Sequence, residues 1–290
     1  MPPPAFSPDP AIPLVDSIAP LAEGTSAWLT DIWGVIHNGV RPFADACTAC
    51  MRYRAAGGIV VLVSNSPRPN DSVAAQLDGI GVPREAWDAI VTSGDVARTL
   101  IGRYAGRPVY HIGPQRDLAT FAGLDIKRVL PEAAEVIVCT GLFDDERETP
   151  DDYAATLAAY LAHNLPMVCA NPDLMVERGG RMIYCAGAIA RAYEELGGKV
   201  EYAGKPYLPI YELTFATLEK LKPGSSDRSR LLAIGDGVGT DIAGAAAAGV
   251  PSVFVASGVH VKGGLDGEAI AALFPAGTPR PIAAMPTLAW

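Results

Sequence analysis

The chain has 290 residues, of which 49% are hydrophobic and 19% are charged. This composition excludes intrinsic disorder and supplies enough apolar side chains for one large domain or for a domain that carries a second. The 23 Lys and Arg residues against 32 Asp and Glu residues give a net charge of −9, so the chain lacks the positive field that attracts nucleic acid or an anionic membrane. Small anionic ligands are not excluded, because local cations, a bound metal or a helix N-terminus can hold a phosphate on an acidic protein.

The N-terminal sequence MPPPAFSPDPAIP has neither the basic start nor the apolar run of a signal peptide. No stretch of the sequence reaches the roughly 18 apolar residues that span a bilayer, so we expect a soluble, cytoplasmic protein. Residues 1–13 are predicted to form a Pro-rich arm. Five cysteines are too few for a disulfide framework in a chain of this length, which indicates a reducing compartment. Cys47 and Cys50 lack a second metal-spaced pair, so we interpret them as half-buried helix residues.

Short apolar runs rich in β-branched residues alternate with Ala- and Leu-rich segments along the chain. This alternation is typical of βα units around a mostly parallel sheet. The predicted strands are residues 27–30, 59–63, 89–92, 109–112, 136–139, 167–170, 231–234 and 252–255. The predicted helices are residues 43–56, 71–78, 94–104, 116–122, 151–163, 186–197, 207–221 and 240–248. Each strand is a compact apolar run, as strands buried on both faces require, so we predict an α/β fold.

Polar residues follow three of these predicted strands. They are Asp31 after the first, Ser64 and Asn65 after the second, and Asp236 and Asp241 in the turn after the seventh. A lysine, Lys205, lies before a predicted helix in Gly204-Lys205-Pro206. Ligands of open parallel sheets bind beyond the carboxyl ends of the strands, where these residues should gather. Carboxylates, a hydroxyl, an amide and a lysine are the groups that hold Mg²⁺ and a phosphate and that attack the phosphate.

Each of these residues taken alone has an ordinary alternative role. An Asp after an apolar strand is more often a turn former or an N-cap than a nucleophile, and a lysine is usually a solvated surface residue. The Gly-x-Gly-x-Gly run at 235–239 does not match a dinucleotide-binding loop, because Thr240 stands where the third glycine would be. The order and spacing of the whole set are therefore more informative than any one member.

In order and spacing, the set resembles the haloacid dehalogenase superfamily of phosphohydrolases. The closest resemblance is to class IIA, which includes the p-nitrophenyl phosphatase, pyridoxal phosphatase and ribonucleotide phosphatase types. The long gap between Ser64 and Lys205 is where class IIA proteins insert an α/β cap, and residues 109–113, 171–173 and 187–188 look like that cap. The resemblance implies a Rossmann-like parallel-sheet core and a C2-type cap domain. The implied boundaries are 14–105 and 200–290 for the core and 106–199 for the cap.

The resemblance also implies a function and a role for each site residue. It implies a Mg²⁺-dependent phosphatase that acts on a small phosphorylated metabolite, such as a sugar phosphate or a nucleotide, through a phosphoaspartate. Asp31 would be the nucleophile, and Mg²⁺ would be held by Asp31, the Trp33 carbonyl and Asp236, with support from Asp241. The phosphoryl oxygens would be held by Ser64, Asn65 and Lys205 and by backbone N–H groups around Trp33 and Gly34. A homodimer that pairs through the cap is one implied arrangement, and candidate specificity residues are Tyr110, Arg116, Asp144, Asp173 and Arg178.

One position departs from the family pattern. Phosphatases of this superfamily carry a second Asp two residues after the nucleophile as general acid and base, and here that position is Trp33. An indole cannot take this role, and the loss of a general acid costs about 10² to 10⁴ in rate. His37 is a candidate substitute acid, and its alternative role is that of a loop histidine touching the cap. The departure leaves two other functions open: a catalytically weakened binder of phosphorylated ligands, and a hydrolase of a C–P or C–halogen bond.

Overall fold

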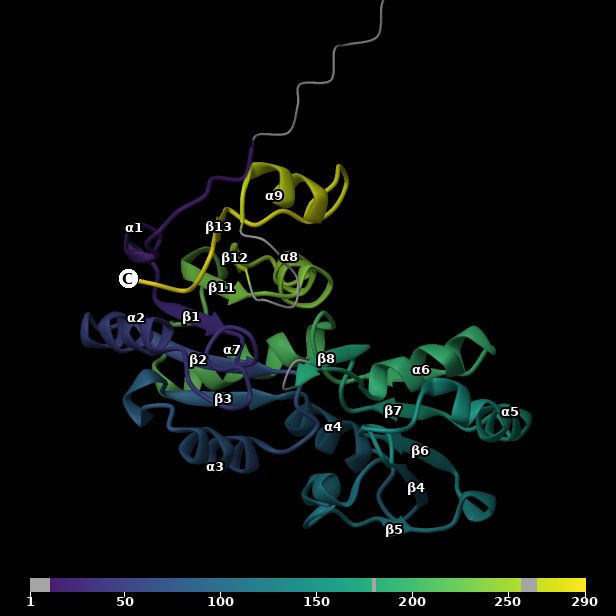
Figure 1. The fold of residues 1–290 in the computed structure, drawn as a ribbon. Helices are drawn as coiled ribbons and strands as arrows, with labels where there is room; N and C mark the ends of the chain where they lie inside the picture. The colour runs from purple at the N-terminus through teal and green to yellow at the C-terminus, as the bar shows by residue number, and fades with distance from the viewer. Residues whose placement is uncertain (1–10, 179–180, 257–264) are drawn as a thin grey trace, which may run out of the picture.

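The fold is built on two parallel sheets, seen in a computed structural model that describes residues 11–178, 181–256 and 265–290 (Figure 1). The larger sheet has the strand order β13-β12-β11-β1-β2-β3, and all neighbouring strands are parallel. Its strands are β1 (Ala27–Thr30), β2 (Ile59–Ser64), β3 (Ala89–Thr92), β11 (Leu231–Gly235), β12 (Ser252–Val255) and β13 (Ala283–Met285). The predicted α/β fold is confirmed, whereas most of the predicted arm, residues 1–10, lies outside the described residues.

Helices cover both faces of this sheet. The helices of the core are α1 (Ala19–Ala22), α2 (Ala44–Ala55), α3 (Asn70–Ile80), α4 (Ser93–Gly102), α7 (Leu208–Leu221), α8 (Ala243–Ala247) and α9 (Gly267–Leu273). Because side chains alternate along a strand, Trp28 packs with α1, α2 and α3 on one face, while Leu29 packs with α4, α7 and α8 on the other. Trp28 stacks on Tyr53 of α2 with ring centroids 4.0 Å apart. Cys47 and Cys50 are buried on α2, in agreement with a structural role.

The smaller sheet has the order β10-β7-β6-β4-β5 and is also parallel throughout. Its strands are β4 (Pro108–Ile112), β5 (Lys127–Arg128), β6 (Val136–Cys139), β7 (Met167–Cys169) and β10 (Val200–Tyr202). Two helices, α5 (Ala154–Ala162) and α6 (Ala186–Glu195), pack on one face of it. The other face shares an apolar cluster with α4 of the core. Since β10 pairs with β7, this sheet extends three residues past the predicted cap boundary at 199.

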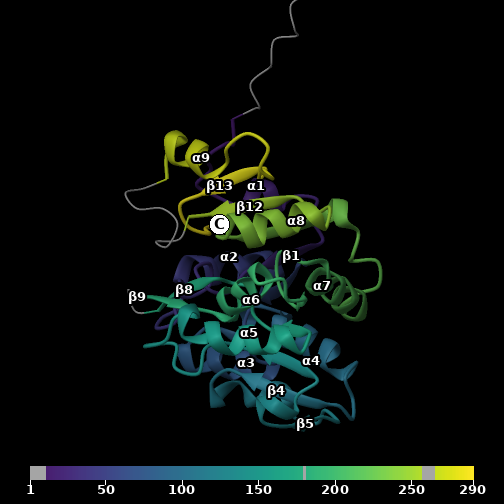
Figure 2. The same ribbon diagram turned by 90° about the vertical axis from the view of Figure 1, so that its right-hand side faces the viewer.

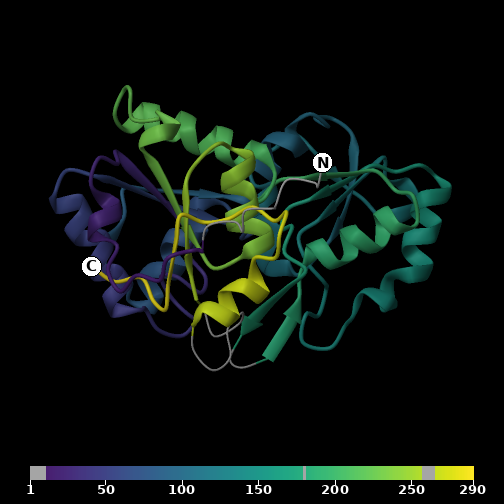
Figure 3. The same cartoon turned by 90° about the horizontal axis from the view of Figure 1, so that it is seen from above.

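We call the larger sheet with its helices the larger lobe, and the smaller sheet with α5 and α6 the smaller lobe. An antiparallel hairpin of β8 (Met175–Arg178) and β9 (Arg181–Tyr184) projects from the smaller lobe beside the larger lobe (Figure 3). Figure 2 shows β12, β13 and α9 at one end of the molecule and β4 and β5 of the smaller sheet at the other. The remaining short helical turns are 3₁₀ helices at Arg84–Ala86, Gln115–Phe121, Pro131–Ala133, Pro150–Tyr153 and Arg228–Arg230, and a π-helix at Val238–Ile242. Among the described residues, no helix is both long and apolar enough to cross a bilayer.

Most predicted elements are present, with three differences in helix type. The predicted helix 116–122 is a 3₁₀ helix, the predicted helix 151–163 begins with one, and the predicted helix 240–248 begins with the π-helix before α8. The sequence did not predict α1, β5, the β8–β9 hairpin, β10, α9 or β13. These elements are two to seven residues long, and most of them are partly exposed, so they lack the long apolar runs that mark buried strands.

Candidate active site

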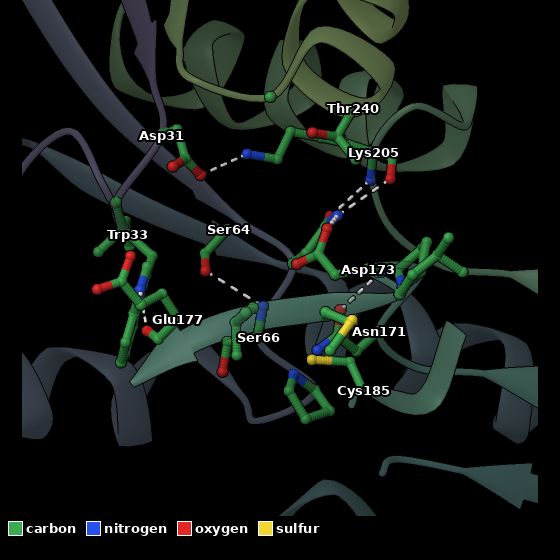
Figure 4. A pocket seen from close by; sticks show the side chains of 18 of the residues that line it. Asp31, Trp33, Ser64, Ser66, Asn171, Asp173, Glu177, Cys185, Lys205 and Thr240 are labelled. Carbon is green, nitrogen blue, oxygen red and sulfur yellow. Dashed lines mark hydrogen bonds and ion pairs between the residues drawn. The ribbon is translucent and has the colours of Figure 1, made fainter. Parts of the chain in front are cut away.

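The strand register brings the predicted site residues to one edge of the larger sheet. Thr30 of β1 lies opposite Ile234 of β11 and Leu62 of β2, so Asp31 follows at the level of Gly235 and Val63. The Asp31 backbone N–H donates to the Ile234 carbonyl oxygen at 2.8 Å, which continues the β1–β11 ladder by one residue. All three strands end here because they are parallel, so their terminal polar residues face one cavity. Figure 4 shows Asp31, Ser64 and Lys205 converging on this edge.

Lys205 connects two of the aspartates. Its Nζ donates to Asp31 Oδ1 at 2.5 Å, to Asp241 Oδ1 at 2.7 Å and to the Val63 carbonyl oxygen at 3.0 Å. Lys205 is only 3% exposed. Burial disfavours the ammonium, but the charges of Asp241 and Asp31 outweigh burial and raise the pKa of Lys205 above its ordinary value. An ammonium has three N–H donors, so a phosphoryl oxygen must replace one of these acceptors to bind Lys205.

Three carboxylates form a cluster that suits a divalent cation. Oxygen atoms of Asp31, Asp236 and Asp241 lie within 4.8 Å of one another, and all three residues are buried. Burial raises the pKa of Asp31 well above its usual range; Lys205 opposes this shift, and Asp241 and Asp236 add to it. A hard cation such as Mg²⁺ prefers carboxylate oxygens, so the donor set fits this ion. The other oxygen of Asp241 accepts the Gly237 N–H at 3.0 Å, so both oxygens of Asp241 accept hydrogen bonds within the protein.

Asn65 is placed differently from its predicted role. Its Oδ1 accepts the Lys205 N–H at 2.7 Å, and its Nδ2 donates to the Lys205 carbonyl at 3.0 Å and to Asp173 Oδ1 at 2.8 Å. The side-chain amide is therefore used to fix the Lys205 backbone and is not directed at a phosphoryl group. A Cβ at Gly204 would lie 2.3 Å from Asn65 Oδ1, so this clamp requires glycine in Gly204-Lys205-Pro206.

Two other predicted phosphate-binding positions, Ser64 and Gly34, also have partners within the protein. Ser64 Oγ accepts the Ser66 N–H at 3.1 Å, and its own hydroxyl proton remains a donor for a ligand. The Gly34 N–H donates to the His37 carbonyl at 2.9 Å and closes the loop after β1. Gly34 therefore does not offer its N–H to a phosphoryl oxygen as predicted. Its positive φ of 89° shows why glycine stands there.

Trp33 fastens the loop after β1 to the hairpin of the smaller lobe. Its indole Nε1 donates to the Glu177 carbonyl of β8 at 3.0 Å, and Figure 4 shows this contact. The ring packs on Gly39, where an added Cβ would lie 2.5 Å from the indole, and lies edge-on to His37 at 5.2 Å between centroids. Trp33, which we expect to stand where the family has its second Asp, therefore makes a structural contact with the cap and has no acidic group to supply a proton.

His37 is buried in the same loop. Its Nδ1 accepts the Gly39 N–H at 2.8 Å, which assigns the ring proton to Nε2. Burial lowers the pKa of His37 to about 4, so the imidazole is neutral at pH 7. A neutral imidazole is a weak acid, and these properties favour the alternative role of a loop histidine packed against Trp33.

A cavity of about 1110 Å³ opens in front of these residues, with walls from both lobes. Among the candidate specificity residues, Arg116, Asp173 and Arg178 line it. Tyr110 instead packs near Tyr160, and Asp144 forms an ion pair with Arg147. Arg68 and Asp145 also line the cavity, although neither was predicted as a site residue. Arg68 follows β2 by four residues, so its position at a strand end was an available signal.

Comparison with known proteins identifies the family. A model of haloacid dehalogenase-like hydrolases matches residues 28–127, and a second model, HAD-hydrolase-like, matches residues 202–276. The crystal structure of a haloacid dehalogenase-like hydrolase from Brucella suis 1330 is 46% identical in sequence and has a TM-score of 0.86. The match covers 94% of this chain and 99% of that one. The chain belongs to the haloacid dehalogenase-like hydrolases.

Two further similar proteins share less sequence with this chain. D-glycerol 3-phosphate phosphatase from Mycobacterium tuberculosis is 27% identical over 245 residues, which are 83% of this chain. The match spans only 65% of that relative's length. A structure of 4-nitrophenylphosphatase from Thermotoga maritima has 19% identity and a TM-score of 0.70 over 92% of this chain and 96% of that one. At this identity, the likeness shows that the fold is shared.

Proposed function

We propose that the chain is a Mg²⁺-dependent phosphatase that hydrolyses a small phosphorylated metabolite through a phosphoaspartate on Asp31. The observation that carries this proposal is the placement of Asp31 beyond β1, bonded to Lys205 and clustered with Asp236. The similarity to a glycerol phosphate phosphatase supports a phosphate monoester as the substrate. The homodimer and the cytoplasmic location remain predictions.

The residues of the chain have distinct tasks in this reaction. An Oδ atom of Asp31 attacks phosphorus, the bond from phosphorus to the leaving oxygen breaks, and water then hydrolyses the acyl phosphate to inorganic phosphate. Lys205 fixes the position of Asp31, and Asn65 fixes the backbone of Lys205. Asp31, Asp236 and the Trp33 carbonyl would hold Mg²⁺, which when bound supplies positive charge to the phosphoryl oxygens and favours ionised Asp31.

The decisive test is hydrolysis of p-nitrophenyl phosphate with Mg²⁺ and with EDTA. We expect turnover with Mg²⁺ and its loss in EDTA.

Mg²⁺ should also raise the melting temperature of the protein by mass action, and Asp236→Ala should remove that shift because the cation loses a ligand. Asp78→Ala, at an exposed position on α3, is the control and should keep both responses. An equal Mg²⁺ response of the wild type and Asp236→Ala would exclude Asp236 from the metal site.

The leaving group should matter more than in a phosphatase with a general acid. Neither Trp33, whose N–H is bonded to Glu177, nor neutral His37 supplies a proton to a leaving alkoxide. We expect p-nitrophenyl phosphate to be cleaved at least about 10²-fold faster than glycerol 3-phosphate, because p-nitrophenolate leaves without protonation. A Trp33→Asp variant should narrow this ratio by about ten-fold or more. Equal rates for the two esters in the wild type would show that another group donates the proton.

The same features support a second function. A protein that lacks a proton donor at the second Asp position can bind a phosphorylated ligand with little turnover. This function would be favoured if the wild type binds phosphate with Mg²⁺ but cleaves neither ester, and if Trp33→Asp is also inactive. Hydrolysis of a phosphonate or a haloacid in the same assay would instead indicate cleavage of a C–P or C–halogen bond.

A further inference from the structure

Three arginines from three separate segments line the cavity that contains Asp31. Arg68 follows β2 in the core, Arg116 lies in the 3₁₀ helix Gln115–Phe121, and Arg178 ends β8. They are close enough for their charges to interact. Burial lowers the pKa of Arg68; Asp117 opposes this shift, and the like charges of Arg116 and Arg178 add to it. Like charges repel, so their convergence on one cavity from distant parts of the chain needs an explanation.

Two aspartates only partly neutralise this group. Asp145 accepts hydrogen bonds from Arg116 and from Arg178, the latter with Nη2 at 2.9 Å, while Asp117 is buried and also lines the cavity. Asp145 is thus shared by two of the three arginines, and within the described residues no hydrogen bond or ion pair joins either aspartate to Arg68. The carboxylate of Asp145 is bound by the guanidinium groups of both Arg116 and Arg178, which shows that this end of the cavity can bind a carboxylate.

The arginines keep donors for a ligand. A guanidinium has five N–H donors, and side-chain bonds among the described residues use one from Arg116, two from Arg178 and one from Arg68, which binds Gln76. The side chains of Arg116 and Arg178 are 51% and 41% exposed, so their remaining donors are accessible. Arg178 follows Glu177, whose carbonyl accepts the Trp33 indole, so the same contact holds Arg178 against the core.

We propose that Arg68, Arg116 and Arg178 form a second anion subsite and that the substrate is a small phosphate monoester with a second anionic group, a carboxylate or a phosphate. This proposal rests on the proposed phosphatase function. The carboxylates and Lys205 act on the phosphate that is cleaved, and the arginines hold the second group through charge-assisted, bidentate hydrogen bonds.

The test compares substrates that differ only at the second group. Glycerol 3-phosphate has no second anion, 3-phosphoglycerate has a carboxylate, and glycerol 1,3-bisphosphate has a phosphate. We expect kcat/KM of the wild type with Mg²⁺ to be at least about ten-fold higher for one of the two substrates with a second anionic group than for glycerol 3-phosphate, as hydrogen bonds between charged groups allow. The substrate with the larger advantage identifies the second group. Equal kcat/KM for all three, with p-nitrophenyl phosphate hydrolysed, would overturn the subsite and leave the phosphatase function intact.

Variants of the arginines test whether these residues cause the higher kcat/KM for the substrate with a second anionic group. Arg178→Gln and Arg116→Gln should reduce the kcat/KM advantage of the substrate with a second anionic group over glycerol 3-phosphate to below about three-fold. Arg178→Lys should restore part of this advantage. Arg147→Gln, which removes an exposed cap arginine outside the cavity lining, should leave the advantage and the basal activity unchanged. An unchanged advantage in both glutamine variants would overturn the proposal.

A binding measurement separates the subsite from the chemistry. If no ester is cleaved, the phosphatase function fails, and calorimetry with Mg²⁺ then compares 3-phosphonopropionate with propylphosphonate. Tighter binding of the carboxylated compound, lost in Arg178→Gln, would uphold the subsite independently of turnover. Equal binding of these two compounds and of propane-1,3-bisphosphonate would overturn it.

Discussion

Asp31→Asn should reduce the turnover of p-nitrophenyl phosphate by about 10⁴-fold or more, because an amide oxygen cannot replace the attacking carboxylate. Asn has nearly the same shape, and its Oδ1 can still accept a hydrogen bond from Lys205, so the site should keep its arrangement. The measurement is kcat with Mg²⁺, with Asp78→Asn on the exposed side of α3 as the control. Retention of more than a tenth of the wild-type kcat would exclude Asp31 as the nucleophile.

The same variant should be more stable than the wild type in EDTA. Burial and the charges of Asp241 and Asp236, opposed by Lys205, raise the pKa of Asp31 in the folded state above its value in the unfolded chain. The folded state therefore holds the Asp31 proton at a higher pH, and ionisation of Asp31 lowers the free energy of unfolding as the pH rises through the raised pKa. Asn cannot ionise, so its stabilising effect should be larger at pH 7 than at pH 4. A destabilised Asp31→Asn protein at pH 7 would contradict this sign.

Lys205→Met should lower the free energy of unfolding in EDTA by about 3–5 kcal/mol, the cost of removing one partner from a buried ion pair. Met fills much of the space of the lysine side chain but leaves Asp31 and Asp241 without the cation that holds them together. Mg²⁺ should recover part of the loss, because a bound cation offsets the same carboxylates. The free energy is measured by urea unfolding.

Lys222→Met is the matched control for this experiment. Lys222 is an exposed lysine at the end of α7, and its replacement should change the free energy of unfolding by no more than about 0.5 kcal/mol. A loss below about 1 kcal/mol for Lys205→Met would mean that the carboxylates repack or take up protons without needing the ammonium.

The parts of the fold that the sequence predicts are those that local chemistry determines. The apolar runs of β1, β2 and β11 are buried along their whole length. Because parallel strands end at a common edge of the sheet, the sequence alone predicts that Asp31, Ser64 and Asp236 lie close together. The β8–β9 hairpin was missed because its strands are mostly exposed and short. The Gly179-Gly180 dipeptide between them in the sequence is a hairpin signal that was available.

Contacts between residues far apart in the chain could not be predicted. The Trp33 indole reaches a carbonyl 144 residues further along, and Asn65 clamps a backbone 140 residues away. Nothing in the sequence near Asn65 shows that its amide binds Lys205 and Asp173 in place of a ligand. A role for Arg68 likewise could not be predicted, because the sequence does not show that Arg116 and Arg178 line the same cavity.

The apolar cluster that α4 shares with the smaller sheet restricts how a substrate enters. Val96, Ala97, Leu100 and Ile101 of α4 belong to one cluster with Val109, Val136 and Val168 of the smaller sheet. Swinging the cap away as a rigid body would expose this surface to water, at roughly 25 cal/mol for each Å² of apolar area. The described residues of the β8–β9 hairpin are exposed or half-buried except Ile183, and the Trp33 indole donates a hydrogen bond from the core to β8. Moving the hairpin would break the Trp33 hydrogen bond without exposing the α4 cluster, so we expect the substrate to enter on the hairpin side of the cavity.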